Sequence, residues 1–302
     1  NSVGRRYRVV SSKRGDLGEQ LLAKLPRQTR GDAKRIFQGH TRFATSSICN
    51  LSGCHPHQWL PRRLQTVWTL DVRTRTFIAA RRSVEGFVTH NGDLDFFTLH
   101  GTTYSLGDVQ RLLGWLLGRP MPSDVDSACV AGLLDLLRTK GVWSAAVRYG
   151  YVYGALSTAA GSLAAHVDSL ASPGEIGAVA ALFEDEWDAL LAECDAAALS
   201  IKVHATEIDL LAHYRTLIEG RMHTRLAAAS GRPPLPGVSD KTAAMRRLAS
   251  SAVSAFFDGD LLRAARELMS GAMGSFGLVL STAIDSLNEI VVAARGQVRV
   301  RV

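Results

Sequence analysis

The chain has few cysteines for its length. Its 302 residues include four, which are Cys49, Cys54, Cys129 and Cys194. They are too few and too scattered for the disulfide framework of a small secreted domain. The first residues are polar and basic and are not followed by the apolar core of a secretory signal. We therefore expect an intracellular protein of a reducing compartment, either the cytosol or the interior of an organelle.

Long apolar runs are also scarce. The stretch that comes nearest to one, residues 149–167, carries no formal charge but is interrupted by several glycines and serines. An apolar stretch interrupted in this way by glycines and serines indicates a buried helix rather than a membrane span. Apolar residues make up 46% of the chain and charged residues 21%, which is typical of a folded globular protein.

Positive charge is in excess but is not concentrated. The formal net charge is +7, and the basic residues occur in short separate pairs such as Arg5-Arg6, Arg62-Arg63, Arg81-Arg82 and Arg246-Arg247. A protein that neutralises several phosphates needs clustered Lys and Arg. We therefore expect no nucleic-acid partner. No segment resembles a cofactor-binding motif, and we expect no cofactor.

The first half of the chain alternates between strand and helix patterns. A hairpin is predicted over 67–79 around the polar turn Arg73-Thr74-Arg75, followed by a short strand that ends at His90. Helices are predicted over 105–117 and 124–137, the second capped by Ser123. Closer to the first residue, the pattern predicts strands over 7–10 and 36–44 and a helix over 16–25.

Residues 141–271 have a different composition, rich in alanine and leucine. Helices are predicted there over 173–194, 206–226, 241–257 and 260–269. Strand character returns at 275–280 and 289–294, on either side of the turn-forming residues 285–288. The second half is therefore expected to be a helical block followed by a closing hairpin.

Three short motifs follow one another along the chain. They are Gly39-His40-Thr41-Arg42-Phe43-Ala44-Thr45, His90-Asn91-Gly92-Asp93 and Ser123-Asp124-Val125-Asp126. In this order they resemble the glutamine-binding pocket of class II (Ntn-type) glutamine amidotransferases. The resemblance implies an α+β fold with two antiparallel sheets stacked between helical layers. Residues 1–140 would form the first part of that fold without its first strands, 141–271 a large all-α insertion, and 272–302 its closing hairpin.

Arg42 is the residue that the resemblance places at the α-carboxylate of glutamine. A planar guanidinium can hold both carboxylate oxygens at once. Thr45 lies near enough along the same strand end to add a hydroxyl contact. The alternative for a single arginine in a strand is a surface ion pair, but the surrounding motif favours substrate binding.

Asn91 and Gly92 are the candidate oxyanion hole. Amide hydrolysis passes through a tetrahedral oxyanion, and each fixed donor around it lowers the barrier by roughly 3 to 4 kcal/mol. An Asn side chain and an adjacent glycine N–H supply two donors, and glycine allows the backbone to come close. By itself, Asn-Gly also indicates a turn.

Asp124 is the candidate partner of the α-amino group of glutamine. In the family, an aspartate at the start of the helix that follows the His-Asn-Gly segment has this role. Asp126 stands two residues further on, and alignment of the motif favours Asp124. Acidic residues at this position are also expected from helix capping and the helix dipole, and the two roles are compatible.

The segment 50–57 corresponds to the Asn-x-His-Pro segment of the family. Its Cys54, His55 and His57, together with Cys49, also invite a zinc interpretation. Their spacing does not match a common structural zinc site, so we expect no metal. Packing of His55 beneath the glutamine pocket is the favoured interpretation.

The nucleophile of the family, an amino-terminal cysteine, is not among the motifs. The chain starts Asn1-Ser2-Val3, and none of its cysteines comes first. Two hypotheses follow. Either the chain is a glutamine amidotransferase or glutaminase domain whose cysteine lies upstream of residue 1, or it is an inactive amidotransferase-like subunit of a larger assembly. In the second case the helical insertion 141–271 would dock on a protein partner.

Overall fold

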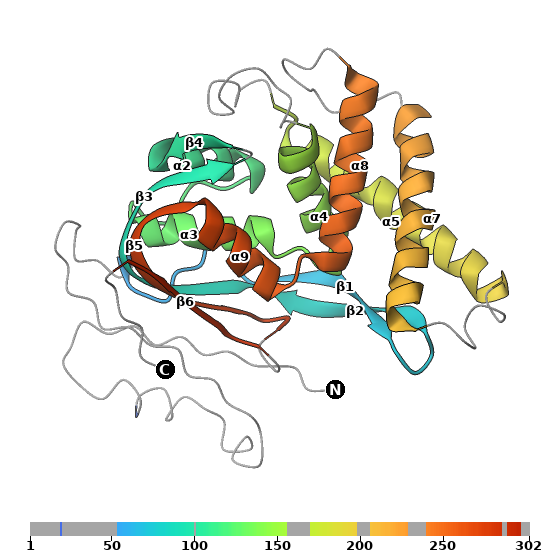
Figure 1. Ribbon diagram of the computed structural model, residues 1–302, viewed down its shortest axis with the longest axis horizontal. Coiled ribbons are helices and arrows are strands. Elements are labelled where there is room, and N and C mark those ends of the chain that lie inside the picture. The colour runs from blue at the N-terminus through green and yellow to red at the C-terminus, as the bar shows by residue number, and fades with distance from the viewer. Residues whose placement is uncertain are drawn as a thin grey trace.

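The described part of the chain is a mixed α+β structure with two antiparallel sheets (Figure 1). The computed structural model describes Glu19 and residues 53–99, 101–155, 170–197, 206–228, 240–285 and 289–296. The predicted α+β class is confirmed. The strands predicted over 7–10 and 36–44 lie outside the described residues, as does the helix predicted over 16–25 except for Glu19.

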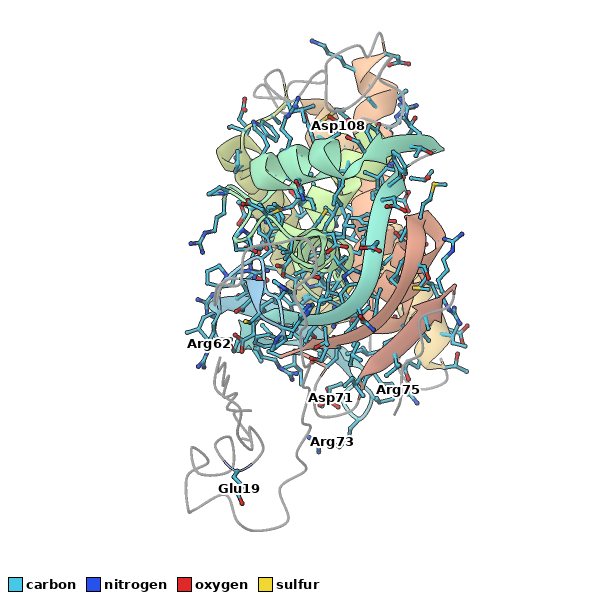
Figure 2. The ribbon with its side chains drawn as sticks, turned by 90° about the vertical axis from the view of Figure 1, so that its left-hand side faces the viewer. Glu19, Arg62, Asp71, Arg73, Arg75 and Asp108 are labelled. Carbon is cyan, nitrogen blue, oxygen red and sulfur yellow. The ribbon has the colours of Figure 1, made fainter. Side chains whose placement is uncertain are left out.

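The first sheet is a two-stranded hairpin of β1 (Arg63–Asp71) and β2 (Thr76–Val84). The Asp71 carboxylate accepts a hydrogen bond from the N–H of Arg73 at 2.8 Å, which stabilises the turn. Arg75 closes the turn with a positive φ of 55°. Figure 2 shows these three side chains together at one end of the molecule. The predicted hairpin and its turn are confirmed.

The second sheet has the strand order β4-β3-β5-β6. Its strands are β3 (Gly86–Leu99), β4 (Thr102–Ser105), β5 (Ala272–Thr282) and β6 (Val291–Arg295). The closing hairpin is therefore present as predicted, although residues 286–288 of its turn are outside the described part. The prediction that the strand ends at His90 is wrong, because pairing with β5 carries β3 through Asn91 and Gly92.

Three helices lie against the four-stranded sheet. Ser105 caps α2 (Leu106–Leu116), since its side chain accepts from the N–H of Asp108. Helices α3 (Asp126–Leu137) and α9 (Leu261–Gly271) cover one face of the sheet (Figure 1). Eleven of the twelve residues of α3 are buried, so this helix lies at the centre of the core.

The helical block packs beside the hairpin. It contains α4 (Trp143–Gly150), the π-helical turn η3 (Tyr151–Ala155), α5 (Pro173–Ala197), α7 (Glu207–Ala228) and α8 (Lys241–Asp258). The four predicted helices are confirmed. Trp143 stacks on Phe256 with ring centroids 3.8 Å apart, and Phe77 of β2 contacts Trp187 of α5 edge-to-face at 4.9 Å. The helices and the hairpin therefore share one hydrophobic core.

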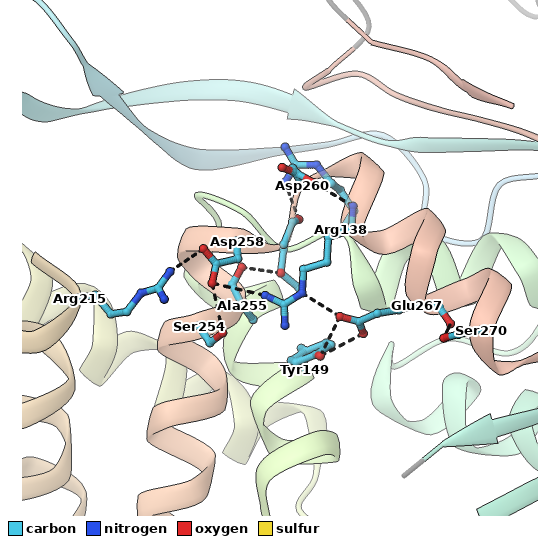
Figure 3. Close-up of polar contacts among 12 residues, drawn as sticks. Arg138, Tyr149, Arg215, Ser254, Ala255, Asp258, Asp260, Glu267 and Ser270 are labelled. Carbon is cyan, nitrogen blue, oxygen red and sulfur yellow. Dashed lines mark hydrogen bonds and ion pairs between the residues drawn. The ribbon is translucent and has the colours of Figure 1, made fainter. Parts of the chain in front are cut away.

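Polar contacts tie the ends of these helices together (Figure 3). Glu267 of α9 accepts hydrogen bonds from the Tyr149 hydroxyl, at 3.0 and 3.1 Å, and from Nε of Arg263 at 2.9 Å. Asp258 at the end of α8 pairs with Arg215 of α7 at 2.5 Å. None of the helices in the described segments is both long and apolar enough to cross a membrane.

Candidate functional site

Strand β3 places Asn91 and Gly92 in the middle of its pairing with β5. Its burial alternates, with Val88, His90 and Leu94 buried toward the helices and Asn91 and Asp93 exposed. Asn91 pairs with Gly277 of β5 and Gly92 with Phe276. The candidate oxyanion residues are therefore on a rigid element, and the Asn91 side chain is on the open face.

Gly92 is required where β3 comes closest to β5. Its φ is +115°, a conformation that other residues rarely adopt, and a Cβ built there would lie 2.1 Å from the carbonyl oxygen of Ser275. Across the ladder, Gly274 has a φ of +145°, and its Cβ would meet the carbonyl oxygen of Asp93 at the same distance. The two glycines allow the two backbones to approach closely beside Asn91.

The free edge of β3 is covered by contacts from two other segments. Val88 and His57 exchange backbone hydrogen bonds of 2.7 and 2.9 Å. The N–H of His90 donates to Nδ1 of His55 at 3.3 Å, and the N–H of Leu94 donates to Oδ2 of Asp126 at 3.0 Å. His55 therefore contacts the strand that carries the His-Asn-Gly motif, and its packing beneath a glutamine pocket stays a prediction.

The two candidate aspartates occupy different positions at the start of α3. The helix begins at Asp126, with Val125 as its cap residue, so the predicted start at 124 with Ser123 as the cap is wrong. Asp124 lies before the helix and is exposed. The Asp126 carboxylate instead accepts from Leu94 N–H and, at 2.7 Å, from the N–H of Ser127. These contacts connect Asp126, rather than Asp124, to the strand that carries Asn91 and Gly92.

The contact between Asp126 and Leu94 forms at an irregularity of the strand. The pairing of β3 with β5 shifts register between Leu94 and Phe96, so Asp95 is an extra residue on β3. Such bulges disrupt the regular ladder and redirect nearby groups. Here the N–H of Leu94 is bound by a carboxylate at the start of a helix, where the helix dipole favours negative charge.

A buried histidine lies behind this carboxylate. Nδ1 of His90 is 2.9 Å from Oγ of Ser127 and 3.7 Å from Oδ1 of Asp126. Burial lowers the pKa of His90 below its ordinary value, although the charges of Asp126 and Asp93 oppose this shift. The imidazole is therefore neutral near pH 7.

The segment that carries His55 and His57 is anchored to α3 at its far end. The N–H of Leu60 donates to Oδ2 of Asp135 at 3.0 Å, and Arg63 lies 3.8 Å from the same carboxylate. Burial raises the pKa of Asp135 to about 6, although Arg63 and the Leu60 N–H oppose the shift. The histidine segment is thus held by β3 at His57 and by α3 at Leu60.

No protein-family model, curated protein or solved structure was found that matches this chain.

The cysteines and the histidine segment offer little other chemistry. Cys129 is a free thiol in the core. Burial, with the nearby charge of Asp126, raises the pKa of Cys129 well above its ordinary value, so this thiol is not an activated nucleophile. Across the segments that the structure describes, no three His, Cys, Asp or Glu side chains are grouped as a metal site would require. Cys49, the fourth residue of the zinc interpretation, is outside them.

The structure thus connects Asp126 to the strand that carries Asn91 and Gly92, through the N–H of Leu94, and leaves Asp124 exposed before the helix. Arg42 and Thr45 lie outside the described residues. Sequence reasoning missed the contact of His90 with Ser127 and the bond of Asp126 to Leu94, while the role predicted for Asp124 stays a prediction. No local signal separates the two aspartates, because acidic residues are favoured at either position near the start of a helix.

Proposed function

We propose that this chain binds free glutamine in an amidotransferase-like pocket at the edge of β3. Asp126 would hold the α-amino group, Asn91 and Gly92 would form the oxyanion hole, and Arg42 with Thr45 would bind the α-carboxylate. One observation carries the proposal: the Asp126 carboxylate accepts a 3.0 Å hydrogen bond from Leu94, two residues beyond Gly92. This bond joins the proposed amine ligand to the proposed oxyanion strand.

The backbone pattern of β3 supports the role of Gly92. Alternate residues of a strand direct their N–H groups to the same edge. Those of Val88, His90 and Leu94 point away from β5, toward His57, His55 and Asp126. By the same alternation, the Gly92 N–H would point to this edge between the groups bound by His55 and Asp126, where it would serve as a donor to the substrate oxyanion.

The Ntn-type sandwich is part of the same proposal. Helices α3 and α9 cover one face of the four-stranded antiparallel sheet. On the other face, Phe96 and Met273 are 46% and 44% exposed and Val292 is 37% exposed. These exposed apolar side chains, which share the face with the polar Asn91 and Asp93, are of the kind that a second layer would cover in a stacked-sheet fold.

The first test compares the two neighbouring aspartates. Isothermal titration calorimetry with L-glutamine is expected to show a loss of affinity of at least about 30-fold for Asp126→Ala, because a charged partner of the ammonium group is removed. Asp124→Ala is the matched control and should bind within about twofold of the parent chain. If neither substitution changes the affinity, or if only Asp124→Ala weakens it, the assignment of Asp126 is wrong.

The second test concerns catalysis. Ammonia release requires a nucleophile, and in this family a cysteine provides it with its own α-amine as the base. A chain extended upstream to such a cysteine is expected to hydrolyse glutamine and to be alkylated there by 6-diazo-5-oxonorleucine. Asn91→Ala in the same chain should lower kcat by roughly 100-fold or more while leaving KM nearly unchanged.

The alternative proposal is an inactive amidotransferase-like subunit. The observation that favours it is the exposed acidic face of α5, where burial and repulsion from neighbouring acidic residues raise the pKa of Glu184 and Asp188. A basic surface of a protein partner would relieve this repulsion. Co-purification of a partner that is lost on Glu184→Lys, together with no glutamine binding, would support this alternative over the first proposal.

A further inference from the structure

His90 is more deeply enclosed than a substrate-binding residue would be. The whole residue is 2% exposed, and its ring lies between β3 and the first turn of α3. Among the described residues, Nε2 has no hydrogen-bond partner, whereas Nδ1 faces Ser127 at 2.9 Å. The polar side chains near the ring in the described segments, Ser127 and Asp126, therefore lie at the start of the helix, and the ring does not reach the open face of Asn91.

Ser127 links this ring to the candidate amine ligand. Its hydroxyl lies 3.4 Å from Oδ1 of Asp126, and its backbone N–H donates to the same oxygen at 2.7 Å. A neutral imidazole that carries its proton on Nδ1 can donate to the Ser127 oxygen, which leaves the hydroxyl proton for Asp126. His90 would then donate a hydrogen bond to Ser127, and the Ser127 hydroxyl would donate one to the carboxylate of Asp126.

We propose that His90 is a positioning residue that sets the selectivity of the pocket for ligands with an α-amino group, by fixing the Asp126 carboxylate through Ser127. This inference rests on the proposed glutamine-binding function. His90 touches no ligand in this scheme. It acts through Ser127, whose N–H and hydroxyl bind Oδ1 of Asp126, while the N–H of Leu94 binds Oδ2.

The neutral state of the ring is essential to this role. A positively charged imidazolium 3.7 Å from Asp126 would neutralise the negative charge of this carboxylate, which the ammonium group of the ligand needs. Burial lowers the pKa of His90 and keeps its ring neutral, although the charges of Asp126 and Asp93 oppose this shift. His55 binds the backbone N–H of His90 and not its ring. A carboxylate that is fixed beforehand and remains negative binds a cation with a smaller loss of conformational freedom.

The experiment compares two ligands that differ only in the α-amino group. Dissociation constants for L-glutamine and for glutaramate, which lacks that group, are measured on the parent chain, His90→Leu and His90→Asn. His90→Leu is expected to weaken L-glutamine by about tenfold and glutaramate by less than twofold. His90→Asn should restore most of the preference for L-glutamine over glutaramate, because the amide nitrogen of the new side chain takes the place of Nδ1.

His223→Leu is the matched control. It removes another imidazole that contacts a serine, with Nε2 3.2 Å from Oγ of Ser250, in the helical block. This variant should leave the ratio of the two dissociation constants unchanged. If His90→Leu weakens both ligands equally, or changes neither, the positioning role is overturned while glutamine binding stands.

Two further outcomes complete the test. If the parent chain binds no L-glutamine, the proposed function is overturned, and this inference with it. If His90→Leu does not fold, Ser127→Ala replaces it, since this smaller change leaves the ring in place and removes the hydroxyl between His90 and Asp126. An unchanged ratio of dissociation constants in Ser127→Ala would overturn the inference.

Discussion

Two regions of the molecule each combine a histidine, a serine and an acidic side chain. At the edge of the sheet, His90 contacts Ser127 and Asp126. Between α7 and α8, His223 contacts Ser250 at 3.2 Å and lies 3.7 Å from Glu219. Composition alone does not distinguish these two clusters, yet only the first is a candidate binding site.

The difference lies in what fixes the carboxylate. Two backbone N–H groups bind Asp126, from Leu94 on β3 and from Ser127 on α3. Glu219 accepts from the side chain of Ser250, and both Glu219 and His223 have about one third of their side chains exposed, at 32% and 33%. Backbone donors on packed elements hold a group more firmly than long side chains on a helix surface.

Neither cluster has the geometry of a catalytic triad. In a triad, one imidazole nitrogen faces the nucleophile and the other faces the carboxylate. Nδ1 of His90 faces both Ser127 and Asp126, and Nε2 of His223 faces both Ser250 and Glu219. The comparison therefore favours a positioning role in the first cluster and a structural contact between helices in the second.

The largest difference between the two regions is expected at their glycines. Gly92→Ala should lower the free energy of unfolding by about 3 kcal/mol or more, because φ is +115° and the new Cβ would meet the Ser275 carbonyl oxygen. Gly220 lies next to Glu219 on α7, and a Cβ added there would meet open space. Gly220→Ala should therefore raise the free energy of unfolding by about 0.5 to 1 kcal/mol. Urea denaturation of both variants measures the two effects.

Equal denaturation midpoints for Gly92→Ala and the parent chain would contradict the close approach of β3 and β5. The Gly220→Ala variant controls for the general effect of adding a methyl group, since it changes an exposed helical position in the other region.

A smaller difference is expected at the two serines. Ser127→Ala leaves Nδ1 of the buried His90 without its serine partner and should cost about 1 to 2 kcal/mol of unfolding free energy. Ser250→Ala removes a contact between partly exposed side chains and places a better helix former in α8, so its effect should stay within about 0.5 kcal/mol. Thermal or chemical unfolding of the pair shows whether the two clusters differ as proposed; similar losses would remove the distinction.

Local chemistry was sufficient to predict many elements of the fold. The turn at 73–75 follows from three polar residues between two strand patterns, and Asp71 stabilises it. The start of α9 follows from Asp260, whose side chain accepts from the N–H of Arg263. In these cases the residues that define the end of the element are neighbours in the sequence.

The candidate site depends on contacts between distant segments, and the sequence predicted it less well. The Asn91-Gly92 pair indicates a turn, but pairing with Phe276 and Gly277 keeps it within a strand. Asp124 and Asp126 are equivalent as first-turn acids, and only the contact of Asp126 with Leu94, 32 residues earlier, separates them. No local pattern reveals a bond formed at a strand irregularity.

The smallest expected effect is a pH dependence that belongs to the first cluster. Because burial lowers the pKa of His90 in the folded chain, the unfolded chain takes up the proton first as the pH falls below 6.5. The unfolding free energy of the parent chain should therefore decrease from this group as the pH falls from 6.5 to the folded pKa of His90, by at most about 1.4 kcal/mol per pH unit.

Asp135 acts in the opposite direction over part of the same range. Its folded pKa of about 6 lies above its ordinary value, so the folded chain takes up that proton first, and acidification adds stability there. The contribution of His90 is therefore the difference in slope between the parent chain and His90→Leu, in which the Asp135 contribution cancels. Urea unfolding at several pH values between 5 and 7 is expected to give a flatter profile for His90→Leu. Parallel profiles would show that His90 titrates alike in the folded and unfolded chains, and the neutral positioning residue would have to be abandoned.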